Sequence, residues 1–210
     1  MIELPFDTVG IDADEATALE KTYNLLRSKF NISLPGKIDT PINKFELFNN
    51  DTNANIGGSL IINPPTNTCY LNFIKNHFSV SAGGRGGGSQ FLNYDKYQVW
   101  AFVNMKKDFG RVLIRRKTFT DGLLEIVNHV ELKIDGDNQF NSTWHVVADD
   151  EKKSKDGLTP ELRAVIMAIK NSKLIIEIVN NTLVIGNNEL INPELIVYLA
   201  DLANDIAEVA

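Results

Sequence analysis

The sequence predicts an α+β protein: a mostly antiparallel β region with an N-terminal helix and a C-terminal strand–helix–hairpin–helix unit. Between about residues 45 and 134, short runs rich in Ile, Val, Phe and Tyr follow one another without helical periodicity. This succession is typical of antiparallel pairing rather than of βαβ units. Helical patterns with recognisable start signals stand near the N-terminus and twice in the last third of the chain.

The composition allows one large core or two small ones, because 43% of the 210 residues are hydrophobic. We predict a division near residue 138. Residues 1–138 would form the N-terminal helix and the β-rich region, and residues 139–210 the strand–helix–hairpin–helix unit. The alternative is a single compact domain that contains both units.

Charge and apolar patterning exclude several classes of partner. A net charge of −6 disfavours sequence-independent attraction to nucleic acid or to an anionic membrane surface. No apolar run approaches the ~20 residues that a membrane-spanning helix needs, and the first residues lack the pattern of a secretion signal. Cys69 is the one cysteine, so no intrachain disulfide can form. These features predict a soluble, cytoplasmic protein without a transmembrane segment.

The N-terminal helix is predicted to begin at Asp12. Asp12 and Glu15 have the spacing of a capping box, in which two side chains satisfy free N–H groups of the first turn. An apolar face follows at helical spacing, formed by Leu19, Tyr23, Leu26 and Phe30. The helix is expected to end before Pro35-Gly36.

The β-rich region contains five predicted strands, separated by turn residues. They are Ser59–Asn63, Thr68–Ile74, Tyr97–Met105, Arg111–Lys117 and His129–Ile134. The glycine-rich segment Gly83–Gly88 interrupts this region. It lacks the Lys-Ser/Thr pair of a phosphate-binding loop, and no helical pattern follows it. We therefore interpret it as a flexible hairpin loop.

Two proline-led helix starts are the clearest local signal of the last third. Thr159 precedes Pro160, and Asn192 precedes Pro193, so a capping side chain stands before a proline at the first helical position in both cases. The apolar face of the first helix is predicted to contain Leu162, Val165, Ile166 and Ile169. That of the second is predicted to contain Leu195, Leu199, Leu202 and Ile206.

The other elements of this third are a strand, a hairpin and two turns. Thr143–Val147 is a predicted strand, and the hairpin pairs Leu174–Val179 with Thr182–Ile185 across Asn180-Asn181, a dipeptide that tolerates positive φ. Asp135–Asn138 has the first two acids of a calcium loop but lacks its glycine and its last acid, so we interpret it as a hairpin turn. Asp149–Glu151 is predicted to be an acidic, solvated turn.

No catalytic residue, metal site or cofactor site is predicted. His77, His129 and His145 are isolated from one another and lack the spacing of zinc ligands. Cys69 lies in an alternating strand, which favours a buried small apolar residue over a nucleophile. Asp108-Phe109-Gly110 matches the metal-binding triplet of kinases, but no other kinase motif accompanies it, so we interpret it as coincidental.

A basic stripe is the candidate binding site. In a strand over Arg111–Lys117, alternation places Arg111, Arg115 and Lys117 on one face and Arg116 on the other. We expect this stripe to face an acidic surface, either the last helix with its Asp205 and Glu208 or a partner protein, or to hold a small anionic ligand. The oligomeric state is left open.

The last third resembles a module of a bacterial domain-of-unknown-function family. The matching pattern is a Phe-led strand, then Val-x-Ala-Asp-Asp, then Leu-Thr-Pro-Glu-Leu opening a helix before a hairpin. It corresponds here to Phe140, Val147–Asp150, Leu158–Leu162 and Leu183. The resemblance covers mainly residues 140–210 and transfers no catalytic residue. In such families the module often follows transmembrane helices, so the resemblance also implies a face that could associate with a membrane.

We therefore predict a non-catalytic binding or interaction module of a bacterial cell. The alternative is a hydrolase-like enzyme with a site assembled from dispersed residues, such as His145 with Asp149 or Asp150 acting as acid and base. A pocket with convergent polar groups would favour the enzyme, and a flat charged surface would favour the binding module.

Overall fold

The computed structural model describes residues 4–36, 38, 40–48, 54–63, 69–83, 89–117 and 130–209, with the side chains of 79–83 and 89–93 excepted. The strands are β1 (Ile32–Ser33), β2 (Asn55–Ile62), β3 (Cys69–Gly83), β4 (Ser89–Asn104), β5 (Arg111–Arg116), β6 (Val130–Glu131), β7 (Trp144–Ala148), β8 (Ile175–Val179) and β9 (Thr182–Gly186). The α-helices are α1 (Ala13–Lys29), α2 (Asn138–Thr143), α3 (Glu151–Gly157), α4 (Pro160–Met167) and α5 (Pro193–Val209), and two 3-10 turns are η1 (Ile42–Lys44) and η2 (Glu46–Phe48).

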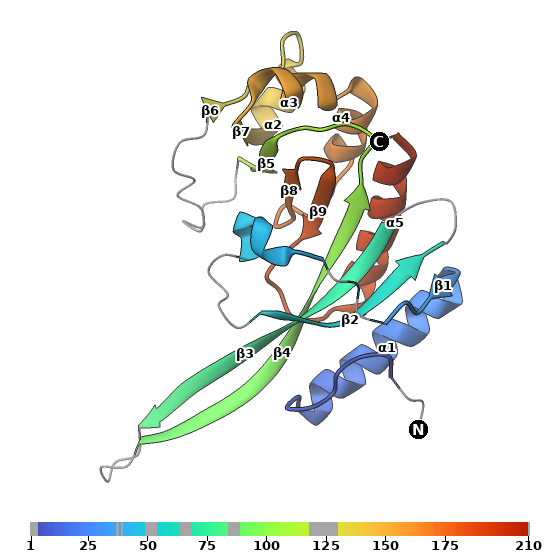
Figure 1. Ribbon diagram of the computed structural model, residues 1–210, viewed down its shortest axis with the longest axis vertical. Helices are drawn as coiled ribbons and strands as arrows, with labels where there is room; N and C mark the ends of the chain where they lie inside the picture. The colour runs from blue at the N-terminus through green and yellow to red at the C-terminus, as the bar shows by residue number, and fades with distance from the viewer. Residues whose placement is uncertain are drawn as a thin grey trace.

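The strands form one antiparallel sheet in the order β1-β2-β3-β4-β9-β8-β5-β7-β6. Strands from the two segments of the sequence are interleaved in it, because β9 pairs with β4 and β5 pairs with β8. The predicted α+β class, mostly antiparallel with an N-terminal and a C-terminal helix, is confirmed (Figure 1).

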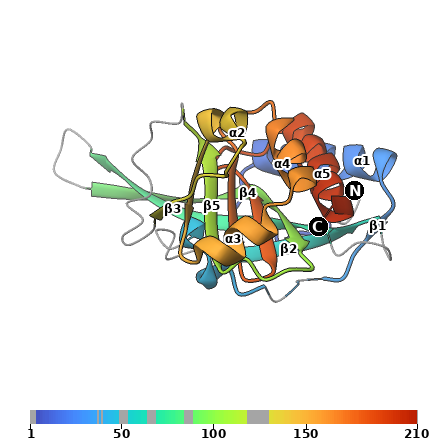
Figure 2. The same ribbon diagram turned by 90° about the horizontal axis from the view of Figure 1, so that it is seen from above.

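The two faces of the sheet carry cores of different size. The larger core joins α1, α4 and α5 to the sheet, with Leu19, Leu162 and Leu199 among its fully buried members. The smaller core lies on the opposite face, where Phe45 and Phe48 of the η1–η2 segment pack against Trp100 and its neighbours. Figure 2 shows the α-helices α1, α4 and α5 on one side of the sheet and the η1–η2 segment on the other.

The first helix begins as predicted, but its acidic first turn does more than cap it. Asp12 accepts a hydrogen bond from the backbone N–H of Glu15 at 2.8 Å, which confirms the cap. The Glu15 carboxylate accepts the backbone N–H of Tyr97 at 2.7 Å, so it ties the helix to β4. Burial raises the pKa of Glu15 above its usual value.

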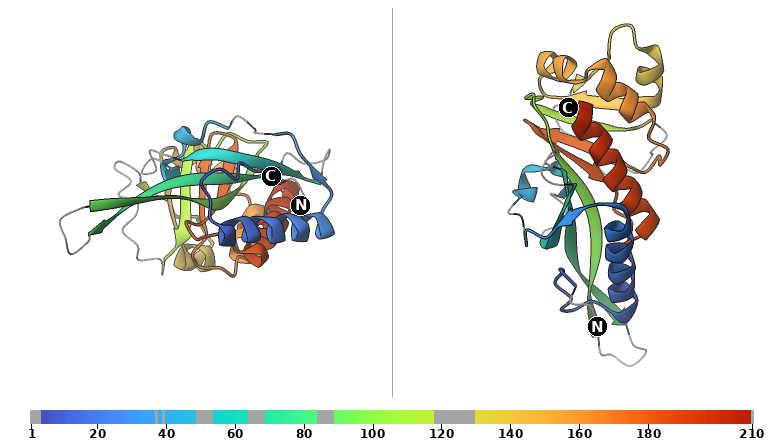
Figure 3. Two further views of the ribbon diagram at one scale, coloured as in Figure 1. Left: turned by 90° about the horizontal axis from the view of Figure 1, so that it is seen from below. Right: turned by 90° about the vertical axis from the view of Figure 1, so that its right-hand side faces the viewer.

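Strands β3 and β4 are much longer than predicted and form an arm that extends beyond the rest of the sheet (Figures 1 and 3). Pairing with β2 reaches β3 only as far as Lys75, and pairing with β9 reaches β4 only from Trp100 onward. The two strands remain paired with each other out to Gly83 and Ser89. The rest of the predicted Gly83–Gly88 loop, residues 84–88, lies outside the described residues.

Two predicted turns of the last third lead directly into helices, so the hairpin prediction for Asp135–Asn138 was wrong. Asp135 and Gly136 do form a turn, with Gly136 at φ of 77°, and Asp149 lies in an exposed bend. Asp137 caps α2 by accepting the N–H of Phe140 at 3.1 Å, so Phe140 lies in a helix rather than at the head of a strand. Asp150 caps α3 by accepting the N–H of Lys153 at 3.0 Å. In both segments one acid forms an ordinary N-cap, a role that competes with hairpin or solvated-turn geometry.

The two proline-led helix starts are confirmed. Thr159 accepts the backbone N–H of Leu162 at 3.3 Å, and Asn192 accepts that of Leu195 at 3.0 Å. The expected apolar faces are buried in part, with Val165 and Leu195 left half-buried. In the intervening hairpin, Asn180 has φ of 55°, the left-handed conformation that its position in the turn requires.

Thr159→Ala is expected to lower the free energy of unfolding by about 0.5–2 kcal/mol, because it removes the side-chain acceptor of the first turn of α4. Thr159→Ser keeps the hydroxyl and serves as the control. Urea denaturation measures the difference. Equal stabilities of the alanine and serine variants would show that the cap contributes nothing.

Candidate functional site

The basic stripe has the predicted alternation, but its members have different roles. Val112 and Ile114 of β5 point into the larger core, whereas Arg111 lies on the face that carries the η1–η2 segment. Arg116 lies on the helix side, with its guanidinium 4.6 Å from the centre of the Trp144 ring, and it donates to the carbonyl of Ile169.

Arg111 is part of a structural ion pair. Its guanidinium lies 2.5 Å from the carboxylate of Glu177 and 3.6 Å from that of Glu46, and it donates to the carbonyl of Lys44. The Glu177 side chain is only 2% exposed. It also accepts the backbone N–H groups of Glu46 and Leu47, both at 3.0 Å. Burial raises the pKa of Glu177, and these N–H groups and Arg111 oppose that rise.

Arg115 and Lys117, the other two members of the stripe, lie near His145 and Glu131 at the end of β5. Lys117 is 3.6 Å from the Glu131 carboxylate, and His145 is 3.7 Å from the same carboxylate. Arg115 is the register partner of His145. Burial lowers the pKa of His145, and the charge of Arg115 lowers it further, which favours the neutral imidazole.

The expected pairing of the stripe with the last helix is wrong. Helix α5 packs on the face of the sheet that carries the larger core, against α1, α4 and β4. Arg111 lies on the opposite face, where its acidic partners are Glu177 and Glu46 rather than residues of α5. The stripe and α5 therefore lie on different sides of one sheet, which sequence spacing could not reveal.

The acid–base group of the alternative enzyme is not assembled. The Asp149 carboxylate accepts the backbone N–H of Arg111 at 2.7 Å, and Asp150 caps α3. His145 lies toward the other end of β7, paired with Arg115, whereas Ala148 next to Asp149 is paired with Val112. Asp149, Asp150 and His145 therefore make separate contacts and do not form one acid–base group.

Cys69 and His77, which the sequence offered as candidates for chemistry, lie in surroundings that explain them as structural residues. Cys69 is fully buried, as predicted, and burial raises the pKa of its thiol to about 12. The His77 imidazole lies 2.6 Å from the Asp95 carboxylate. His129 lies outside the described residues. Within the part of the chain that is described, no three His, Cys, Asp or Glu side chains are grouped so that they could hold a metal ion.

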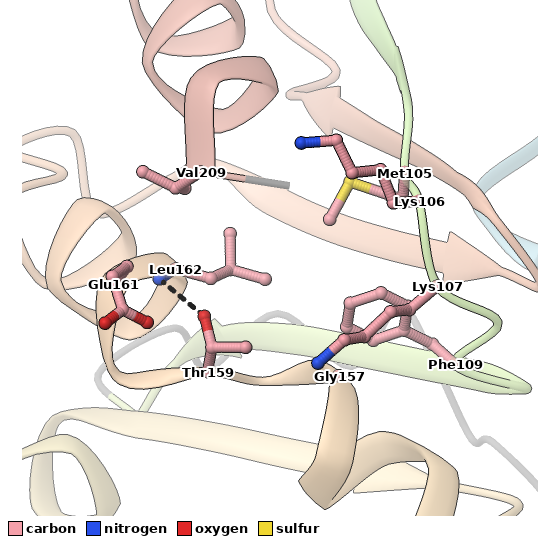
Figure 4. Close-up of a pocket in the computed structure, with 9 residues that line it drawn as sticks. All are labelled: Met105, Lys106, Lys107, Phe109, Gly157, Thr159, Glu161, Leu162 and Val209. Carbon is pink, nitrogen blue, oxygen red and sulfur yellow. Dashed lines mark hydrogen bonds between the residues drawn. The ribbon is translucent and has the colours of Figure 1, made fainter.

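The candidate site is a pocket of about 280 Å³ at the C-terminal end of α5 (Figure 4). We call it the α4 pocket. Three segments that are distant in the sequence form its wall: the β4–β5 connection, the junction of α3 and α4, and the last turn of α5. Its apolar side chains are Met105, Phe109, Leu162 and Val209.

The apolar wall is held in place by backbone contacts. The N–H groups of Met105 and Phe109 donate to the carbonyls of Asn181 and Asn180, at 2.7 and 2.8 Å. The Phe109 ring is 1% exposed and lies directly against Gly157, where an added Cβ would come within 2.4 Å of the ring. A side chain larger than hydrogen at position 157 would therefore displace Phe109.

The polar side chains of the α4 pocket come from two sides. Lys106 and Lys107 extend from the β4–β5 connection, and Thr159 and Glu161 belong to the start of α4 (Figure 4). Lys107 donates to the carbonyl of Asp156 at 3.0 Å. The pKa of Glu161 is lowered, mainly by its own backbone N–H and the Thr159 hydroxyl, so its carboxylate is ionised at neutral pH.

Sequence reasoning missed the α4 pocket, although two of its parts were visible. Thr159 was recognised as a cap and Lys106-Lys107 as basic residues. The signal that could have drawn attention to the region is the Asp108-Phe109-Gly110 triplet. Its phenylalanine is buried and its glycine has φ of 69°, as a tight connection between two strands requires.

Comparisons with known proteins place the chain in no family. No family model matches it, and no curated protein matches it. Among solved structures, it is similar to the crystal structure of the mycobacterial trehalose monomycolate transport factor A, TtfA, with a TM-score of 0.46 and 8% identity, over 90% of this chain and 92% of that chain. At this TM-score and identity, the likeness assigns neither a fold family nor a function.

Among the described residues, no helix has the length and apolar character needed to cross a membrane.

Proposed function

We propose that the protein is a non-catalytic binding protein and that the α4 pocket is its site for a small ligand. The observation that carries this proposal is the convergence of three distant segments on one concave, mainly apolar surface with a few polar groups at its edge. Such a combination is typical of ligand sites. A volume of about 280 Å³ lies just below the usual range for such sites, about 300–1,000 Å³, so the ligand is small.

The side chains of the pocket support binding rather than chemistry. Its lining contains no His, Cys or Ser. The Thr159 hydroxyl already accepts the N–H of Leu162 and contacts the Glu161 carboxylate, so it has the environment of a helix cap. A nucleophile needs an adjacent base that a third group orients, and this lining does not provide that set.

Val209→Trp is expected to weaken binding of neutral aromatic probes, because the indole side chain would occupy the pocket that Val209 lines. Indole itself is a suitable probe, and ligand-observed NMR measures its binding. Val130→Trp is the matched control, since Val130 is 69% exposed and lies on β6.

Indole is expected to bind the parent protein and Val130→Trp with similar affinity, and Val209→Trp at least about tenfold more weakly. Thermal denaturation checks that both variants fold. Equal binding of indole to the parent protein and to a folded Val209→Trp variant would contradict the proposed function.

A further inference from the structure

We infer that the natural ligand of the α4 pocket is a small amphiphilic carboxylate, with its head at Lys106 and Lys107 and its apolar tail against Phe109, Leu162 and Val209. This inference rests on the proposed function and adds the chemical class of the ligand. Three properties of the pocket carry it: a carbon-rich wall, two lysines from one connection at its edge, and a net charge of the lining side chains that matches a single negative head group.

The wall selects an apolar tail. Met105, Phe109 and Leu162 belong to the buried core and are 5%, 1% and 1% exposed, so the interior of the pocket is continuous with the larger core. Val209, at the end of α5, closes one side of this surface. Carbon atoms of a ligand that enters here leave water, and each buried CH₂ group is expected to tighten binding about fourfold.

The two lysines select an anionic head. Both extend from the β4–β5 connection, and in Figure 4 the Lys106 ammonium group lies toward Val209 and the Lys107 ammonium group beside Gly157. Lys107 uses one of its ammonium hydrogens for the carbonyl of Asp156, which leaves two for a ligand. Lys106 is exposed and makes no hydrogen bond or ion pair with the described residues. A cationic head would be repelled here, and a neutral head would gain no charge-assisted hydrogen bond.

The charge balance favours a carboxylate over a phosphate. Among the described side chains that line the pocket, two lysines and the ionised Glu161 sum to a net charge of about +1. A carboxylate carries one negative charge, whereas a phosphate monoester carries about −1.5 to −2 at neutral pH. Glu161 is near enough to Lys107 for the lysine to lower its pKa, so a doubly charged head would be repelled by this carboxylate.

The test compares three probes with one tail and different heads: octanoate, octanol and octylamine. Calorimetric titration of the full chain at low salt is expected to show octanoate binding about five- to tenfold more tightly than octanol, with octylamine weakest. Butanoate should bind much more weakly than octanoate, because it buries fewer CH₂ groups. Raising the salt concentration should reduce the preference for octanoate over octanol.

Variants of the lining residues test whether the preference for octanoate over octanol arises in the α4 pocket. The double variant Lys106→Met, Lys107→Met is expected to bind octanoate no more tightly than octanol, and Glu161→Gln to bind octanoate about two- to fivefold more tightly than the parent. Lys21→Met removes an exposed lysine of α1 and should leave the preference unchanged.

The outcomes separate this inference from the proposed function. If octanol or octylamine binds the parent as tightly as octanoate, or if the lysine double variant keeps the preference, the ligand class is wrong although the pocket still binds. If indole binds and none of the three octyl probes does, the ligand class is also wrong. If indole and all octyl probes fail to bind, the proposed function falls together with the inference.

Discussion

Glu177→Ala is expected to lower the free energy of unfolding by about 3–5 kcal/mol, one of the two largest effects predicted for this protein. The Glu177 carboxylate is 2% exposed and is the common acceptor of the Arg111 guanidinium and of two backbone N–H groups of the η1–η2 segment. Its removal leaves those donors without their acceptor beneath the segment. Chemical denaturation measures the loss.

Glu46→Ala is the matched control. Glu46 also lies near Arg111, at 3.6 Å, but its side chain is 27% exposed. An ion pair with this exposure is worth about 0–1 kcal/mol. If the two alanine variants lost equal stability, Glu177 would not be the anchor of the η1–η2 segment.

Phe109→Ala is expected to cost about 3–5 kcal/mol and to enlarge the α4 pocket. The ring is 1% exposed and packs against Gly157, so truncation leaves a cavity that the surrounding backbone can fill only in part. The main chain of Phe109 links the β8–β9 turn to α3, since its N–H donates to the carbonyl of Asn180 and its carbonyl accepts the Ser154 hydroxyl. Denaturant unfolding gives the change in stability.

Phe78→Ala provides the comparison for a phenylalanine outside the core. Phe78 lies on the β3–β4 arm, is 38% exposed and stacks on Tyr94 at 5.5 Å. Its truncation is expected to cost about 1 kcal/mol or less. A loss at Phe109 no larger than that at Phe78 would show that the floor of the pocket is not part of a close-packed core.

Local features of the fold could be predicted from the sequence, because their causes lie within a few residues. The caps at Asp12, Thr159 and Asn192 each depend on a side chain and an N–H group three residues later. The alternation of β5 follows from strand geometry alone. The same rules failed at Asp137 and Asp150, where an acid suits either a turn or a helix cap.

Features that depend on distant parts of the chain could not be predicted. Glu15 binds an N–H group 82 residues away, and Arg111 binds a carboxylate 66 residues away. The strand order, in which β9 inserts between β4 and β8, determines both which face of the sheet Arg111 occupies and where α5 lies. The stripe seemed an exposed binding surface because its buried partner Glu177 was not identifiable from spacing.

The candidate site was beyond sequence reasoning for the same reason. Lys106 and Val209 line one pocket but are about half the chain apart, and the pocket exists only when α5 is packed on the sheet. Phe109 appeared within a motif that was set aside as coincidental, and that interpretation stays a prediction. What gives this phenylalanine a role in the candidate site is its burial against Gly157.

One measurement tests the central claim, that the α4 pocket is the binding site, most directly: an NMR titration of isotope-labelled protein with octanoate. The account predicts that the methyl signals of Met105, Leu162 and Val209 shift together and saturate at one equivalent bound, while the aromatic signals of Phe78 and Tyr94 on the arm stay in place. Saturable shifts confined to the arm or to the stripe, with the three methyl signals unchanged, would contradict it.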